Sequence, residues 1–211
     1  MQEIVEGNDW RSGEFARFKA NQNKVEPDLW YRMCIPMIYA HWEGFVVDAL
    51  KIMLKHLNGL NLKYSVLPTK LIVLSIGDSY KSLSGKQSFS QRIEFTDKFK
   101  SLFNSVVTFK TKVETKSNLK SNVFKELCDI FGFNEQPYCE YLKNVDRLVH
   151  IRNSIAHGEN NILPTLENIT LYIDSVQKCS DLLLIDIENY LLEERFLIEN
   201  HGINISNESG V

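Results

Sequence analysis

The sequence predicts an all-α protein, an antiparallel helical bundle with a short β-ribbon insertion. Long stretches repeat apolar residues every three or four positions, which is typical of helices with one buried face. Of the 211 residues, 44% are hydrophobic and 24% are charged, as in a globular protein with a sizeable core. No linker divides the chain, so we expect one domain over residues 1–199 and a mobile C-terminal tail over residues 200–211.

The first half of the chain has four stretches with helical spacing. They cover residues 9–24, 28–57, 67–83 and 88–104, the last two separated by a Ser-Gly break at 84–85. Pro36 should kink the second helix without ending it, because the apolar spacing continues on both sides. His41 falls in the apolar face of the same helix and is expected to be a core histidine. Glu43 either lies beside the core or partners an arginine.

The second half begins with the predicted β-ribbon over residues 106–115, where β-favouring residues alternate with polar ones. A helix over residues 118–131 follows and should end at Gly132. Pro137 then opens a helix at a position where proline is well tolerated. The last helix starts near Pro164, and its thirty or so residues would span about 45 Å. It is expected to pack on the Pro137 helix and on the helix over residues 28–57.

Polar side chains that can carry chemistry crowd the end of the helix that Pro137 opens. Arg152 falls inside the apolar spacing of this helix, between Val149 and Ala156. A guanidinium at such a position needs a carboxylate, a ligand or a wet cleft, because burying it unpaired is very costly. A neighbouring polar stripe has the spacing i, i+4, i+7 and i+11. Its members are Asp146, His150, Asn153 and His157.

Gly158 is expected to end this helix in the left-handed conformation, which leaves His157 in the last turn. A helix C-terminus favours the charged form of histidine, so His157 is suited to gain and lose a proton. An imidazole beside the fixed cation of Arg152 suits reactions at phosphate esters, where arginine holds the anion and histidine moves protons. The alternative interpretation is structural: His150 and His157 are solvated, and Arg152 forms a salt bridge to another helix.

Two stretches of the sequence resemble a known superfamily. The hexapeptide Arg152-Asn153-Ser154-Ile155-Ala156-His157 matches the R-N-x-x-x-H pattern of HEPN proteins, which are small α-helical domains. Residues 39–46 (YAHWEGFV) resemble the early helix of the HEPN branch known as the MAE_28990/MAE_18760-like group. With the helices between them, the resemblance covers nearly the whole chain and implies a HEPN-like bundle.

The resemblance implies a metal-independent endoribonuclease without a cofactor, acting as a toxin or defence effector. In HEPN ribonucleases two protomers place both motifs in one cleft, which implies a homodimer. Arg152 would stabilise charge on the phosphate, Asn153 would hold the ring or the phosphate, and His157 would transfer protons. An antitoxin or another partner protein is also implied. Some HEPN toxins carry a tyrosine two residues after the motif histidine, used for adenylylation, but this chain has Glu159, so that regulation is not expected.

The same resemblance leaves a second function open, a non-catalytic HEPN-like module that binds RNA or a protein and dimerises. Residues 98–125 hold seven lysines against one acid, although the whole chain has a net charge of −3. Phenylalanines interleave with these lysines, a pattern suited to contact with a nucleic-acid backbone. The alternative is a solvated connection without a ligand. The side chains expected to bind RNA are Lys110, Lys112, Lys116, Arg147 and His150.

Several other classes of site and location are not expected. The four cysteines lie far apart without a CxxC pair, so they read as buried free thiols in a reducing cytoplasm. The amino terminus lacks the features of a signal peptide, and the longest apolar run, residues 71–74, is too short to span a membrane. A metal site from Asp146, His150 and His157 is set aside, because the two histidines are two helical turns apart.

Overall fold

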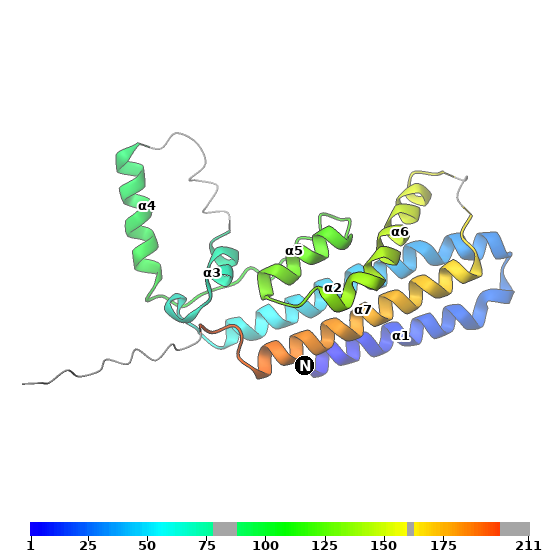
Figure 1. The fold of residues 1–211 in the computed structure, drawn as a ribbon, viewed down its shortest axis with the longest axis horizontal. Helices are drawn as coiled ribbons and strands as arrows, with labels where there is room; N and C mark the ends of the chain where they lie inside the picture. The colour runs from blue at the N-terminus through cyan, green and yellow to red at the C-terminus, as the bar shows by residue number, and fades with distance from the viewer. Residues whose placement is uncertain (78–87, 160–162, 199–211) are drawn as a thin grey trace, which may run out of the picture.

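The computed structural model describes residues 1–77, 88–159 and 163–198 (Figure 1). The long elements in these ranges are helices, which confirms the all-α fold class. They are α1 (Gln2–Asn21), α2 (Pro27–Gly59), α3 (Thr69–Ile76), α4 (Phe89–Leu102), α5 (Ser121–Phe131), α6 (Cys139–Ala156) and α7 (Leu166–Leu192). Short 3-10 turns are found at η1 (Gln22–Lys24), η2 (Tyr64–Val66) and η4 (Gln136–Tyr138).

Four of the helices form the predicted antiparallel bundle. Figure 1 shows α1, α2 and α7 side by side, with α1 running opposite to α2 and α7. Helix α6 packs on both α2 and α7 and runs opposite to them, so its C-terminal end lies near the start of α2. Helices α3, α4 and α5 lie in the connection between α2 and α6. Of these, α5 packs on α3 and α6, whereas α4 buries none of its side chains.

Helix ends follow the local sequence signals. Gly132 has φ +71° and ends α5, as predicted, and Pro36 lies inside α2 without interrupting it. Helix α1 begins seven residues earlier than predicted. Helix α3 ends at Ile76, before Gly77 with φ +42°, and residues 78–83 of the predicted helix lie outside the described residues. Residues 78–87, with the predicted Ser-Gly break, and the predicted tail at 200–211 lie outside the described residues.

The predicted β-ribbon over residues 106–115 is wrong. In this stretch Val106 forms an isolated bridge to Lys63, and no strand follows it. The alternation that favoured a strand does exist, because Val107 and Phe109 are buried while their neighbours are exposed. The side chain of Asn58 on α2 takes the place of a partner strand. It donates to the carbonyl of Phe109 at 3.0 Å and accepts from its N–H at 2.7 Å.

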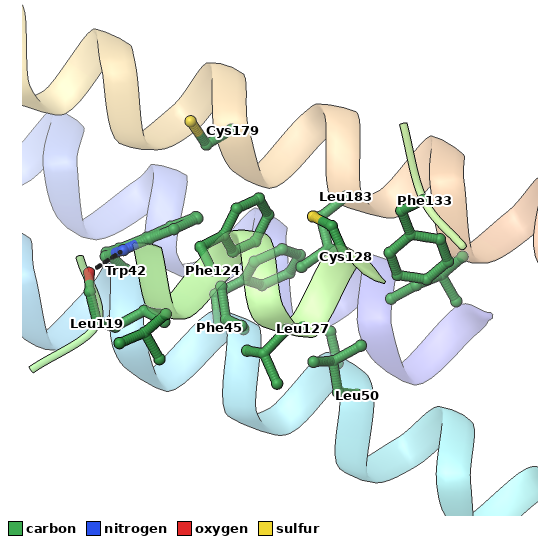
Figure 2. Close-up of a cluster of buried hydrophobic side chains, with 14 of the residues drawn as sticks. Trp42, Phe45, Leu50, Leu119, Phe124, Leu127, Cys128, Phe133, Cys179 and Leu183 are labelled. Atoms are coloured by element: carbon green, nitrogen blue, oxygen red, sulfur yellow. Dashed lines mark hydrogen bonds between the residues drawn. The ribbon is translucent and has the colours of Figure 1, made fainter. Parts of the chain in front are cut away.

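The core joins α5 to the bundle, as Figure 2 shows. Phe124 of α5 packs on Trp42 of α2, with ring centroids 5.1 Å apart, and on Tyr138, at 4.9 Å. Burying such aromatic side chains supplies much of the stability of a domain of this size. All four thiols are free, as expected. Three of them are buried, whereas Cys139 is half-buried.

His41 is a core histidine, as the sequence predicts. Its ring lies 5.0–5.9 Å from the rings of Trp10, Phe15 and Phe18 on α1. Burial lowers the pKa of His41 below the ordinary value, and the nearby Arg11 charge lowers it further. The neutral imidazole therefore helps to fasten α1 to α2.

Candidate functional site

Helix α6 carries the motif and presents it at its C-terminal end. The helix buries one face, formed by Leu142, Val145, Leu148, Val149 and Ser154, against the bundle. Arg152 and Asn153 lie at the border of that face and are half-buried, whereas His157 is exposed. The packing of α6 on α2 therefore fixes the positions of the Arg152 and Asn153 side chains.

Arg152 lies on an aromatic ring. Its guanidinium carbon is 4.4 Å from the centroid of Tyr39 on α2, and its Nη1 donates to Oδ1 of Asn153 at 2.9 Å. A cation over an aromatic face is worth roughly 0.5–2 kcal/mol. Within the described residues, no carboxylate lies within ion-pairing distance of Arg152. The guanidinium is thus positioned, but its charge is not neutralised, in contrast to the structural interpretation of the sequence.

Asn153 links Arg152 to the segment that precedes α5. While its Oδ1 accepts from Arg152, its Nδ2 donates to Oδ1 of Asn118 at 3.3 Å. Asn118 follows a turn in which Lys116 and Ser117 both have positive φ, 55° and 50°. Side chains other than glycine are strained in that conformation. The strained turn therefore serves to bring Asn118 to the motif.

The same segment is held on α2 by buried hydrogen bonds. The N–H of Leu119 donates to the hydroxyl of Tyr39 at 2.9 Å, and its carbonyl accepts from Nε1 of Trp42 at 3.2 Å. Glu43, whose role the sequence left open, accepts from the hydroxyl of Thr115 at 2.6 Å. Burial raises the pKa of Tyr39 to about 12, with a smaller opposite effect of the Leu119 N–H bond. Tyr39 therefore stays neutral beneath Arg152.

His157 is the C-cap residue of α6. Gly158 has φ +78°, as predicted, and the N–H groups of Gly158 and Glu159 donate to the carbonyls of Ile155 and Ser154, both at 3.0 Å. This is a Schellman ending, which satisfies the last carbonyls of the helix. Nη2 of Arg32 on α2 also donates to the carbonyl of Glu159, at 2.7 Å. Within the described residues the imidazole of His157 has no hydrogen bond or ion pair, and it remains accessible.

The other members of the polar stripe differ in role. Asp146 accepts from both the N–H and the hydroxyl of Ser121, at 2.7 and 2.6 Å, and so caps the start of α5. His150 and Arg147 are exposed on α6. Within the polar stripe, Asp146 therefore has a structural role, whereas His150 faces solvent. In the described residues no group of three His, Cys, Asp or Glu side chains could hold a metal ion.

The predicted RNA-binding lysines are not gathered around Arg152. The segment that carries these lysines, residues 109–119, lies along α2. Asn58 of α2 bonds Phe109 at one end of the segment, and Tyr39 of α2 bonds Leu119 at the other. Asn58 and Tyr39 are about 28 Å apart along the helix axis. Lys112 pairs with Glu114 at 2.6 Å, and Lys116 pairs with Glu126 at 2.7 Å. Lys110 lies at the far end of the segment, and Lys116 lies nearest the motif.

Sequence reasoning missed two residues that hold the motif, Tyr39 and Asn118. In the sequence, Tyr39 stands out only as the first residue of the stretch 39–46 that resembles a HEPN helix. Its spacing on α2 gave no signal that it would meet an arginine more than a hundred residues away. Nothing in the sequence around Lys116 and Ser117 predicts two successive positive-φ residues, and so the approach of Asn118 could not be foreseen.

The antiparallel bundle with Arg152, Asn153 and His157 at one end of α6 defines a protein of the HEPN superfamily. The chain belongs to the RiboL-PSP-HEPN family, whose family model matches residues 6–189. The match confirms the superfamily expected from the sequence, but it does not confirm the MAE_28990/MAE_18760-like subgroup. No curated protein and no solved structure shows a significant match. No helix in the described ranges is long and apolar enough to cross a membrane.

The cap of α6 gives a test of how His157 is positioned. Replacing Gly158 by alanine should lower the free energy of unfolding by about 1–2 kcal/mol, because its φ of +78° strains any residue with a Cβ. Urea unfolding followed by circular dichroism measures the change. The matched control is Gly13→Ala in the exposed middle of α1, where an added Cβ meets no neighbour. That variant should gain up to about 1 kcal/mol. Equal effects at the two sites would contradict the assigned cap.

Proposed function

We propose that the protein is a metal-independent endoribonuclease that uses Arg152 and His157 at the phosphate of RNA. The observation that carries the proposal is an arginine that is held in place with no carboxylate of the described residues paired to it, on the same helix end as an accessible histidine. A fixed, un-neutralised cation beside a group that transfers protons suits phosphoryl chemistry better than a structural role.

The reaction is an attack of the ribose 2′-hydroxyl on the adjacent phosphorus. A histidine in the role of His157 accepts the hydroxyl proton, the new P–O bond closes a 2′,3′-cyclic phosphate, and the P–O5′ bond breaks. The leaving 5′-oxygen takes up a proton from a general acid, a role that His157 of either protomer can fill. Because the substrate supplies its own nucleophile, no metal is needed to generate one.

Arg152 and Asn153 have separate tasks in this mechanism. Arg152 uses one N–H on Asn153, and its other donors form no hydrogen bond within the described ranges, so they can bind the phosphoryl oxygens as their charge increases. Asn153 acts as a positioning residue, because its oxygen holds the guanidinium and its nitrogen is anchored on Asn118. This refines the expectation that Asn153 would hold the imidazole or the phosphate.

A homodimer would complete the site. Beside the motif, α2 exposes an apolar stripe, formed by Leu29, Met33, Met37 and Ala40. Leu29 and Met33 are 52% and 51% exposed, and Met37 is 40% exposed. Apolar side chains at spacings of four, four and three residues form one face of a helix, and such a face favours contact with an equivalent face. Tyr39, which carries Arg152, adjoins the stripe, so pairing two stripes would bring two motifs together.

RNA contacts outside the motif would come from His150, Arg147 and the lysines of the segment on α2, Lys110, Lys112 and Lys116. The setting that fits such an activity is a cytoplasmic toxin or defence effector that an antitoxin or another partner protein controls. The pairing of Lys112 and Lys116 with glutamates favours a second candidate, a non-catalytic module that binds RNA or a protein.

The test is cleavage of RNA by the purified protein in EDTA. Wild-type protein should cleave and leave cyclic phosphate ends. Arg152→Ala and His157→Ala should each lose at least about 10²-fold in rate, since each removes a group that acts on the reacting phosphate. The matched control is His56→Ala, which removes an exposed histidine near the end of α2. Failure to cleave any RNA would favour the binding module, and full activity of His157→Ala would exclude the mechanism.

The dimer is tested separately by light scattering. Wild-type protein should be a dimer, and Met33→Glu should be a monomer with reduced cleavage, because it places a charge in the middle of the apolar stripe. Ile185→Glu, at a residue of α7 that is 53% exposed, is the matched control and should remain dimeric. A monomeric wild type would contradict the two-protomer site.

A further inference from the structure

A second candidate site lies between α1 and α2 and is formed by residues other than those around the motif of α6. A pocket of about 240 Å³ opens between the two helices. Its charged lining residues are Glu3, Arg11, Asp48, Lys51 and Lys55, and Trp10 and Phe45 are its aromatic ones. None of these residues belongs to the motif of α6 or contacts it through a hydrogen bond or ion pair.

Arg11 is the central group of this pocket. It is only 7% exposed, yet its hydrogen bonding is incomplete. Nη1 donates to the carbonyl of Gly7 at 2.7 Å, and Nη2 donates to Asp48 at 2.8 Å, but the buried Nε has no partner in the part of the chain that the structure describes. Leaving a buried donor of a charged group unpaired is unfavourable, because the group loses its hydration without gaining a hydrogen bond. Arg11 lines the pocket, so an anionic ligand there would gain from the charge of its guanidinium.

Both helices leave room for the guanidinium. A Cβ at Gly7 would lie 3.3 Å from Nη1 of Arg11, and one at Gly44 would lie 3.4 Å from Nη2. Glycine inside a helix is less favourable than alanine, so two glycines facing one side chain are not favoured by helix formation itself. Both glycines therefore lie against the guanidinium of Arg11, one on each helix.

The rest of the pocket combines an aromatic surface with further positive charge. Trp10 is 54% exposed, and Arg11 lies over its ring at 4.8 Å from the centroid. Lys51 and Lys55 are exposed one turn apart on α2. Three cations line the pocket against the carboxylates of Glu3 and Asp48, of which Asp48 is already bound to Arg11. An excess of donors beside an exposed indole suits a phosphate attached to a flat ring.

We propose that this pocket binds a nucleotide. Arg11, Lys51 and Lys55 bind the phosphate, and the base lies against the exposed part of the Trp10 indole. The pocket is distinct from the proposed ribonuclease site, so nucleotide binding here does not require Arg152 or His157. Either proposal can therefore fail without the other.

Adenosine 5′-monophosphate is the probe, and the indole N–H signals of the intact chain in ¹⁵N NMR spectra are the readout. Trp30 and Trp42 are 5% and 0% exposed, so the signal of Trp10 can be distinguished by its broadening with an added soluble spin label. The nucleotide should shift the Trp10 signal saturably. Lys51→Gln combined with Lys55→Gln should weaken binding at least about tenfold, because two charge-assisted contacts are lost.

Two comparisons locate the bound nucleotide. Lys98→Gln, which removes a lysine of α4 whose side chain is 72% exposed, should bind as wild type does. His157→Ala should also retain binding. An absent Trp10 shift, or unchanged affinity in the double lysine variant, would overturn the proposal. Affinity for inorganic phosphate equal to that for the nucleotide would overturn the placement of the base on Trp10.

Discussion

The buried peptide of Leu119 is the constraint on which the geometry of the motif depends. Leu119 is 0% exposed, so its N–H and carbonyl must find partners inside the protein. Both partners are aromatic side chains of α2, Tyr39 for the N–H and Trp42 for the carbonyl. These two bonds fasten the segment before α5 along α2. They also fix the hydroxyl edge of the Tyr39 ring, whose face carries Arg152.

From that constraint the chain builds a site out of three distant parts. The segment brings Asn118 to Asn153, α2 supplies the ring beneath Arg152, and α6 ends in a glycine cap that leaves His157 in solvent. Rigid helices thus hold the arginine, while the histidine lies at an accessible end. Such a division is useful for catalysis, where the group that stabilises charge must be fixed in advance and the group that transfers protons must reach the substrate.

Periodicity and helix-ending residues predicted the all-α bundle, the C-terminal caps at Gly132 and Gly158, and the core position of His41, because these depend on local physics. The β-ribbon was predicted wrongly, since the alternation in residues 106–115 reflects packing on α2 with Asn58 in place of a neighbouring strand. The sequence also did not predict that Arg152 would lie on Tyr39 or that Asn118 would bond Asn153. Contacts between α2, the segment before α5 and α6 are non-local, and no single stretch of sequence encodes them.

A double-mutant cycle between Tyr39 and Asn153 tests the central claim most directly. The two side chains share no hydrogen bond, and the account links them through Leu119, Asn118 and Arg152. Tyr39→Phe keeps the ring and removes the hydroxyl, and Asn153→Ala removes the amide. Urea unfolding of both single variants and the double variant should give a coupling energy of about 0.5–1.5 kcal/mol. Additive effects, within about 0.3 kcal/mol, would contradict the claim that Tyr39 and Asn153 both hold the segment before α5.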